Sequence, residues 1–188
     1  TADDYAQHGA NLKASPPMRT GHDRVALRAA LREGLIDIVA TDHAPHTKEE
    51  KAARYASFAQ VPGGMPGVQT LLATMLHFVE QGAIDLPALV RMCATNPAQR
   101  FGLGRSKGAL APGRDADILV LDLAQYTSIR DAAQHSRAAY TPFAGMRVRG
   151  KLDSVYLRGA LAYTDQQTAA SFPPPAGKVI GELAHGHA

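Results

Sequence analysis

The sequence contains few of the residues that build disulfide frameworks, membrane spans or nucleic-acid surfaces. Its 188 residues include one cysteine, Cys93, and no tryptophan. A single cysteine excludes an internal disulfide and favours a reducing, cytoplasmic location. No apolar run approaches the ~18 residues of a membrane span, and no signal peptide opens the chain. The 20 Lys+Arg and 17 Asp+Glu are interspersed, giving a net charge of +3. We therefore expect neither nucleic acid nor a membrane as partner.

What remains is an ordinary globular composition, with 45% hydrophobic and 20% charged residues. The length suits one good-sized domain, or a small domain joined to a piece of another. The sequence begins with Thr1 and polar residues rather than with a strand. We read this as the continuation of something longer.

The most informative stretch is the apolar, β-branched run of residues 36–41, which ends at Asp42. Such a run predicts a strand buried on both faces, as in a parallel sheet. A carboxylate at its end needs a partner, because burying an unpaired charge is costly. A metal ion or a neighbouring histidine, His43 or His46, would serve. A carboxylate that merely caps the next turn is the alternative.

The preceding residues predict a strand and a helix. Residues 11–15 read as a short strand that Pro16 stops, which presents Ser15 at the strand end. Thr20 and Asp23 form a capping-box pattern, so a helix is expected up to about residue 33, with Gly34 as its C-cap. Strand, helix and strand with tight connections are typical of a parallel βαβ unit.

A long loop over residues 42–67 follows. Loops of this length are usually functional, as lids or binding loops, but for this loop taken alone a plain surface excursion is the default interpretation. Helices are expected over residues 68–80 and from about residue 85. Residues 95–97 are expected to break the second helix. After residue 102 a small β unit is predicted. Its strands are residues 118–121, 126–129, 146–152 and 155–163, the last broken by a turn at residues 159–160.

Residues 40–47 (ATDHAPHT), with Glu49-Glu50-Lys51, resemble the signature of dihydroorotases, which are cyclic amidohydrolases of the amidohydrolase superfamily. Further segments agree in order and spacing over roughly residues 1–165. They are residues 11–19 (NLKASPPMR), 62–67 (PGGMPG), 95–98 (TNPA), 108–117 and 141–145 (TPFAG). Ser15 in a Ser-Pro-Pro context is closer to hydantoinases and dihydropyrimidinases, where dihydroorotases commonly carry Asn.

The resemblance implies an α/β fold: the C-terminal part of a metal-dependent (β/α)8 TIM barrel over residues 1–104, and a small β-sandwich domain over residues 105–165. A polar tail would occupy residues 166–188; its His185 and His187 carry little weight as metal ligands. The remaining ligands of the family's metal site belong upstream of Thr1. The chain therefore reads as a fragment that is inactive alone.

The resemblance also implies the site. Asp42 would be the catalytic residue: it would bind one Zn²⁺ of a binuclear centre and shuttle the proton from a metal-bound hydroxide to the ring nitrogen. Ser15, His46, Gly63 and Gly64 would bind a small cyclic amide substrate, and His43 would support the site without binding metal. The implied reaction is the reversible hydrolysis of dihydroorotate to N-carbamoyl-aspartate in pyrimidine biosynthesis.

Three readings stay open beside it. An allantoinase or a hydantoinase/dihydropyrimidinase would act on a different ring, and a catalytically inactive homologue would serve as a structural partner. The retention of Asp42 and His46 argues against the inactive homologue. A homodimer, and an association with the missing N-terminal part, are also compatible with the sequence.

Overall fold

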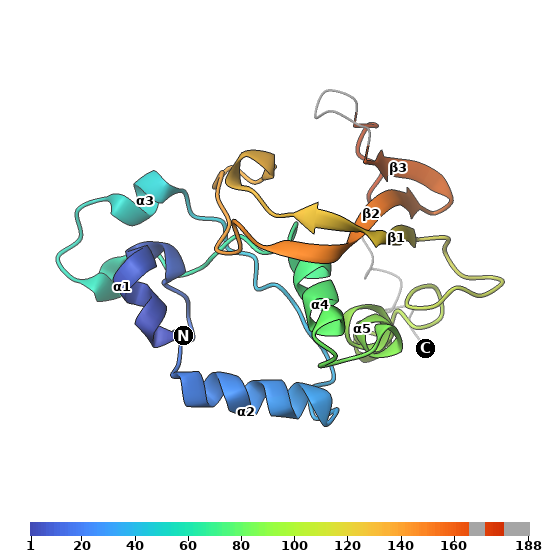
Figure 1. The fold of residues 1–188 in the computed structure, drawn as a ribbon. Coiled ribbons are helices and arrows are strands. Elements are labelled where there is room, and N and C mark those ends of the chain that lie inside the picture. The colour runs from blue at the N-terminus through green and yellow to red at the C-terminus, as the bar shows by residue number, and fades with distance from the viewer. Residues whose placement is uncertain (166–171, 179–188) are drawn as a thin grey trace, which may run out of the picture.

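The computed structural model describes residues 1–165 and 172–178, which form short helices and a three-stranded sheet (Figure 1). The first helices are η1 (Ala2–Asp4), α1 (Tyr5–His8), η2 (Gly9–Leu12), α2 (Gly21–Arg32), α3 (Lys48–Ala52), η3 (Phe58–Gln60) and α4 (Leu71–Glu80). The next are α5 (Leu86–Val90), η4 (Arg91–Thr95), α6 (Asn96–Arg100) and η5 (Asp131–Ala133). The strands are β1 (Ile118–Ser128), β2 (Arg147–Leu157) and β3 (Ala160–Thr164).

Helix α2 has the boundaries that its sequence predicts. The Thr20 side chain accepts a hydrogen bond from the Asp23 backbone N–H, and the Asp23 carboxylate accepts one from the Thr20 N–H at 3.0 Å. Gly34 follows the helix with a φ of +72°, the left-handed conformation that glycine adopts without steric cost. Local signals fix both ends of this helix.

The two strands expected before the loop are absent, and both predictions were wrong as stated. Residues 9–12 form η2, and residues 35–42 form neither a helix nor a strand. Among the described residues, the backbone of the run 35–42 is hydrogen-bonded at three places. Leu35 N donates to Ala30 O (2.9 Å), Val39 N donates to Met92 O (3.3 Å), and Asp37 O accepts the Asn96 side chain (2.8 Å). A strand needs a neighbour to complete its ladder, and the described residues supply none here.

The helix that begins at Asp85 continues to Arg100, so the break predicted at residues 95–97 does not occur. A π-helical turn, η4, joins α5 to α6 and accommodates Pro97 in the first turn of α6. Thr95 in this turn donates its hydroxyl to Gly108 O at 2.8 Å. A Cβ on Gly108 would lie 2.6 Å from Ala98 Cβ, so this close contact requires glycine. The π turn therefore fixes where the chain leaves the helices.

The β unit is a three-stranded antiparallel sheet in the order β1-β2-β3. The two short strands predicted at 118–121 and 126–129 are one long strand, β1, with a register shift between Asp122 and Tyr126. The β2–β3 turn lies at Arg158 and Gly159, both with positive φ, one residue earlier than predicted. A second sheet, which a sandwich would need, is not found in residues 1–165 or 172–178.

Helix α4 packs against the face of β2, and their contact carries the hydrophobic core (Figure 1). Val148 of β2 and Met75 of α4 are fully buried there, together with Leu76. Leu31, Leu89 and Met92 complete this cluster. The core thus joins residues on both sides of position 104, and the predicted division at that position stays a prediction.

None of the described helices is both long and apolar enough to cross a membrane. Of the predicted tail, residues 172–178 are irregular and exposed, whereas residues 166–171 and 179–188, with His185 and His187, lie outside the described residues.

Candidate functional site

Three segments that are far apart in the sequence meet at one place. Gly64 donates its backbone N–H to Lys13 O at 2.8 Å, which joins the glycine loop to the Ser15 segment. The same loop pairs with the Asp42 segment: His43 and Met65 form a parallel bridge, and Ala44 N donates to Met65 O at 3.1 Å. The folded chain therefore assembles the segments that the sequence marked as a site.

Only glycine fits at position 64. Its φ is +133°, and an added Cβ would lie 2.4 Å from Ala44 Cβ and 2.9 Å from Ala44 O. Gly63 is exposed and packs beside Ser15, because a Cβ built on Gly63 would lie 3.8 Å from Ser15 Cβ. Ser15 is also exposed, so these two predicted substrate residues form one accessible surface.

Asp42 lies on the same extended segment with an exposed side chain and a φ of +43°, a region that Asp tolerates better than most residues. Within the described part of the chain its carboxylate has no hydrogen bond or ion pair, so it does not cap the next turn. No three His, Cys, Asp or Glu side chains come together there either. A zinc site takes about four ligands. The described residues alone therefore do not form a metal site, although Asp42 leaves one carboxylate free to bind.

His46 is held at the start of α3. Its backbone N–H donates to Ala44 O at 3.0 Å, and its Nδ1 lies 3.5 Å from Glu50 Oε2. The Glu50 carboxylate also accepts the Thr47 N–H at 2.9 Å, within a capping box. This backbone hydrogen bond holds the pKa of the Glu50 carboxyl below its usual value, so Glu50 remains an acceptor for His46.

His43 holds the end of the glycine loop through hydrogen bonds to its backbone. Its Nδ1 accepts the backbone N–H groups of Gly67 (3.0 Å) and Val68 (3.2 Å). A ring nitrogen that accepts must be unprotonated, so the neutral ring carries its proton on Nε2. His43 also borders a cavity of about 260 Å³ that includes Gln69 and His135.

A residue that sequence reasoning missed lies under the site. Lys51 is only 2% exposed, and its Nζ donates to Ala10 O at 3.0 Å and Lys13 O at 3.1 Å. In the sequence it stands in a charged run (KEEK) that suggests a solvated surface. The available signal is its place in the Glu49-Glu50-Lys51 part of the family signature, to which no role was assigned.

Two exposed ion pairs join the loop between β1 and β2 to α3. Lys48 pairs with Asp131 at 3.1 Å, and Arg137 pairs with Glu50 at 3.4 Å. Asp131 also accepts the Thr141 backbone N–H at 2.9 Å, so the 141–145 motif is connected through Asp131 to Lys48 of α3.

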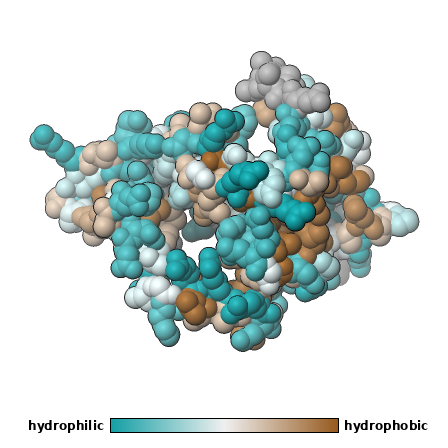
Figure 2. All heavy atoms as spheres, in the orientation of Figure 1, coloured by the Kyte–Doolittle hydropathy of each residue, from teal (hydrophilic) through white to brown (hydrophobic). Residues whose placement is uncertain are grey.

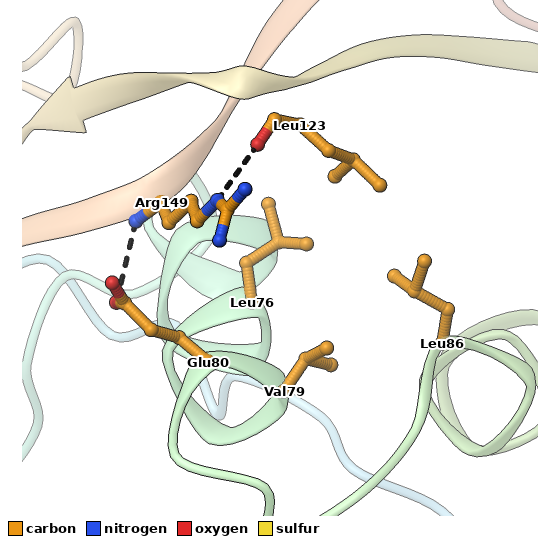
Figure 3. A pocket seen from close by; sticks show the side chains of 6 residues that line it. All are labelled: Leu76, Val79, Glu80, Leu86, Leu123 and Arg149. Atoms are coloured by element: carbon orange, nitrogen blue, oxygen red, sulfur yellow. Dashed lines mark hydrogen bonds between the residues drawn. The ribbon is translucent and has the colours of Figure 1, made fainter.

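The apolar depression between α4, α5 and the sheet contains none of the predicted site residues (Figure 3). Its volume is about 320 Å³, and its only polar side chains are Glu80 and Arg149. Glu80 accepts the Arg149 N–H at 3.3 Å, and Arg149 Nε donates to Leu123 O at 3.1 Å (Figure 3). The candidate site is therefore the junction of the Ser15, Asp42 and Gly63–Gly64 segments, and not this depression.

Solved structures of hydantoinases have the same fold as this chain. The chain superposes on a D-hydantoinase with a TM-score of 0.83 and 33% identity, covering 87% of this chain and 37% of that one. It matches the L-hydantoinase (dihydropyrimidinase) from Arthrobacter aurescens with a TM-score of 0.81 and 34% identity, covering 87% of this chain and 37% of that chain. The fold is thus of the α/β class that these hydrolases share.

The sequence gives the family. Residues 2–162 match the Amidohydrolase family, and the chain belongs to it. It is 34% identical to the dihydroorotase of Clostridium acetobutylicum over 167 residues, 88% of this chain and 38% of that protein. It is 40% identical to the dihydroorotase of Methanosarcina acetivorans over 147 residues, 78% of this chain and 31% of that protein. The chain thus spans about a third of the length of these relatives.

Proposed function

We propose that this chain is the substrate-loop and proton-transfer part of a cyclic amidohydrolase that hydrolyses dihydroorotate reversibly to N-carbamoyl-aspartate, a reaction of pyrimidine biosynthesis in the cytoplasm. One observation carries the proposal: the Ser15, Asp42 and Gly63–Gly64 segments are hydrogen-bonded into one junction. The similarity to dihydroorotases at 34–40% identity supports the choice of ring.

In this proposal the exposed surface of Ser15 and Gly63 receives the ring, and His46 recognises its carboxylate or ring. Asp42 accepts a proton as water adds to the ring carbonyl. It then returns that proton to the ring nitrogen as the C–N bond breaks. A carboxylate without a hydrogen-bond partner among the described residues is free for both steps.

The proposal includes Zn²⁺ held partly by Asp42, within a barrel completed by upstream strands and helices. Of the ligands that a zinc site needs, the described residues supply one, Asp42. The extended run 35–42 offers the backbone groups that neighbouring strands would pair with. Beside it lies an apolar groove of about 750 Å³, lined in part by Leu27, Leu31 and Phe78. In the space-filling view, an opening separates α2 from the elements above it (Figure 2).

The test is a turnover panel of dihydroorotate, hydantoin and allantoin, with the full-length gene product that carries residues 1–188. Dihydroorotate should be the preferred substrate. Asp42→Asn should lower kcat by at least about a hundredfold, since general acid–base groups contribute about 10²–10⁴. Because Asp42 is exposed without a hydrogen bond, the same variant should change stability by less than about 0.5 kcal/mol. Full activity of Asp42→Asn would refute the role.

A hydantoinase is the second candidate, and two observations favour it: Ser15 stands in a Ser-Pro-Pro context, and hydantoinases are among the matching solved structures. Preference for hydantoin in the same panel would select this reading. Loss of all three activities, with the metal bound, would favour the inactive homologue.

A further inference from the structure

Lys51 is a buried cation without a carboxylate partner among the described residues. Lysine is almost never fully buried unless it is paired, yet Lys51 is 2% exposed. Its Nζ is satisfied instead by the backbone carbonyls of Ala10 and Lys13, at 3.0 and 3.1 Å. Burial lowers the pKa of the Lys51 ammonium, and the charge of Lys13 lowers that pKa further. An apolar side chain at position 51 would avoid both the burial of a charge and the repulsion from Lys13. The presence of the hydrogen-bond donors of the Lys51 ammonium therefore needs an explanation.

The Lys13 carbonyl is shared between two donors that approach from different elements. Lys51 Nζ reaches it from α3, and Gly64 N–H reaches it from the glycine loop at 2.8 Å. This one oxygen therefore links α3, the Ser15 segment and the substrate loop. A carbonyl has two lone pairs, so it can accept both bonds at once.

Lys13 strengthens the same connection in the other direction. Its own Nζ donates to Ala59 O at 2.6 Å and to Val61 O, just before the glycine loop. The two lysines thus connect residues 10–13 with residues 51 and 59–64 through backbone carbonyls. Ser15 follows two residues later, in contact range of Gly63.

We infer that Lys51 is a positioning residue for substrate binding: its ammonium fixes the Lys13 carbonyl so that Gly64, Gly63 and Ser15 keep one relative arrangement. The identity of the substrate in this inference rests on the proposed function, whereas the positioning of Gly64 by Lys51 does not. Lys51 touches neither the exposed surface of Ser15 nor Asp42, so it acts through Lys13.

The test compares Lys51→Met with Lys48→Met. Methionine keeps an unbranched apolar chain without the donors, and Lys48 stands on the same helix with its side chain 49% exposed. In the 188-residue chain, amide hydrogen exchange at Gly64 should accelerate about tenfold in Lys51→Met, the effect of one lost hydrogen bond. Exchange at Val148 in the core should change less, and Lys48→Met should leave Gly64 unchanged.

In the full-length gene product, Lys51→Met should raise KM about tenfold and leave kcat within about twofold, as expected when uniform substrate binding is lost. Lys51→Ala with added propylammonium should recover Gly64 protection, because the free cation restores the donors. Equal acceleration at Gly64 and Val148 would overturn the inference, since it would show a general loss of stability. If Lys51→Met does not fold, absence of rescue in Lys51→Ala overturns it instead.

The two failures are distinguishable. Absence of any cyclic amide turnover by the unsubstituted protein would reject the proposed function, while the exchange experiment would still decide whether Lys51 holds Gly64. Normal turnover with unchanged exchange in Lys51→Met would reject the inference and leave the proposed function standing.

Discussion

Replacing Gly64 by alanine should destabilise the chain far more than replacing its neighbour Gly63. The structure gives two separate costs at position 64. A φ of +133° is rare for residues with a Cβ, and the added Cβ would lie 2.4 Å from Ala44 Cβ. Backbone strain of about 1–3 kcal/mol and overpacking of about 1–3 kcal/mol together predict a loss of roughly 2–6 kcal/mol.

Two other glycines separate these costs. Gly82 has a φ of +66° with open space around it, so Gly82→Ala should show backbone strain without a clash, about 1–2 kcal/mol. Gly63 has no such φ, and its nearest neighbours would lie 3.8 Å from an added Cβ. Gly63→Ala should therefore be neutral, or up to about 1 kcal/mol more stable, because alanine lowers the entropy of the unfolded chain.

Equilibrium urea unfolding of the three variants measures these differences, and an unchanged m-value would show that the same surface is exposed in each. The expected order of stability is Gly63→Ala, then Gly82→Ala, then Gly64→Ala. A Gly64→Ala variant as stable as Gly82→Ala would refute the close approach of the glycine loop to Ala44. The junction of the site would then have to be looser than described.

Two further predictions concern parts of the chain away from the site. Thr20→Ala should lower the free energy of unfolding in urea by about 1 kcal/mol, because it removes the N-cap of α2. The control Ser57→Ala, at an N-cap without a side-chain hydrogen bond, should lower it by less than about 0.5 kcal/mol. Equal losses would contradict the capping box. The Lys107 ammonium holds the pKa of the Asp117 carboxyl below its ordinary value, so the ion pair stabilises the fold above that ordinary value and the stabilisation is lost as the pH falls through the lowered pKa. Lys107→Met should therefore be less stable than the unsubstituted chain at neutral pH, and this difference should shrink as the pH falls through the lowered pKa of Asp117. A pH-independent difference would contradict this pairing.

The sequence predicts elements whose signals are local. Helix α2 is the clearest case, because Thr20, Asp23 and Gly34 determine its ends through contacts with neighbouring residues. The long β1 and the hairpin at Arg158 and Gly159 were predicted in position but not in detail. Register shifts depend on the partner strand, which a single run of residues does not specify.

The extended run before Asp42 shows where such reading fails. Its apolar, β-branched residues predict a strand from their propensity, but a strand exists only with a hydrogen-bonded neighbour. The helix break predicted at residues 95–97 was wrong for another reason. The first turn of a helix tolerates proline, and the π turn η4 places Pro97 in the first turn of α6.

The site was predicted as a set of segments rather than as a network. The motifs around Ser15, Asp42 and Gly64 mark three segments of the sequence, and the structure brings those segments together. Lys51 was missed because burial of a lysine cannot be read from a charged run. His43 was assigned a supporting role only through the family pattern, and its two backbone donors are visible only in the fold.

The π-helical turn η4 makes the contact between the helix that contains it and Gly108 depend on the number of residues in that helix. Each residue in a helix advances the direction of the side chains by about 100°. Loss of one residue between Arg91 and Thr95 would remove the π turn and displace Thr95, whose hydroxyl donates to Gly108 O. The close contact of Gly108 with this helix would then be lost. Insertions and deletions should therefore accumulate in the surface loops during evolution, while the residue count of this helix stays constant.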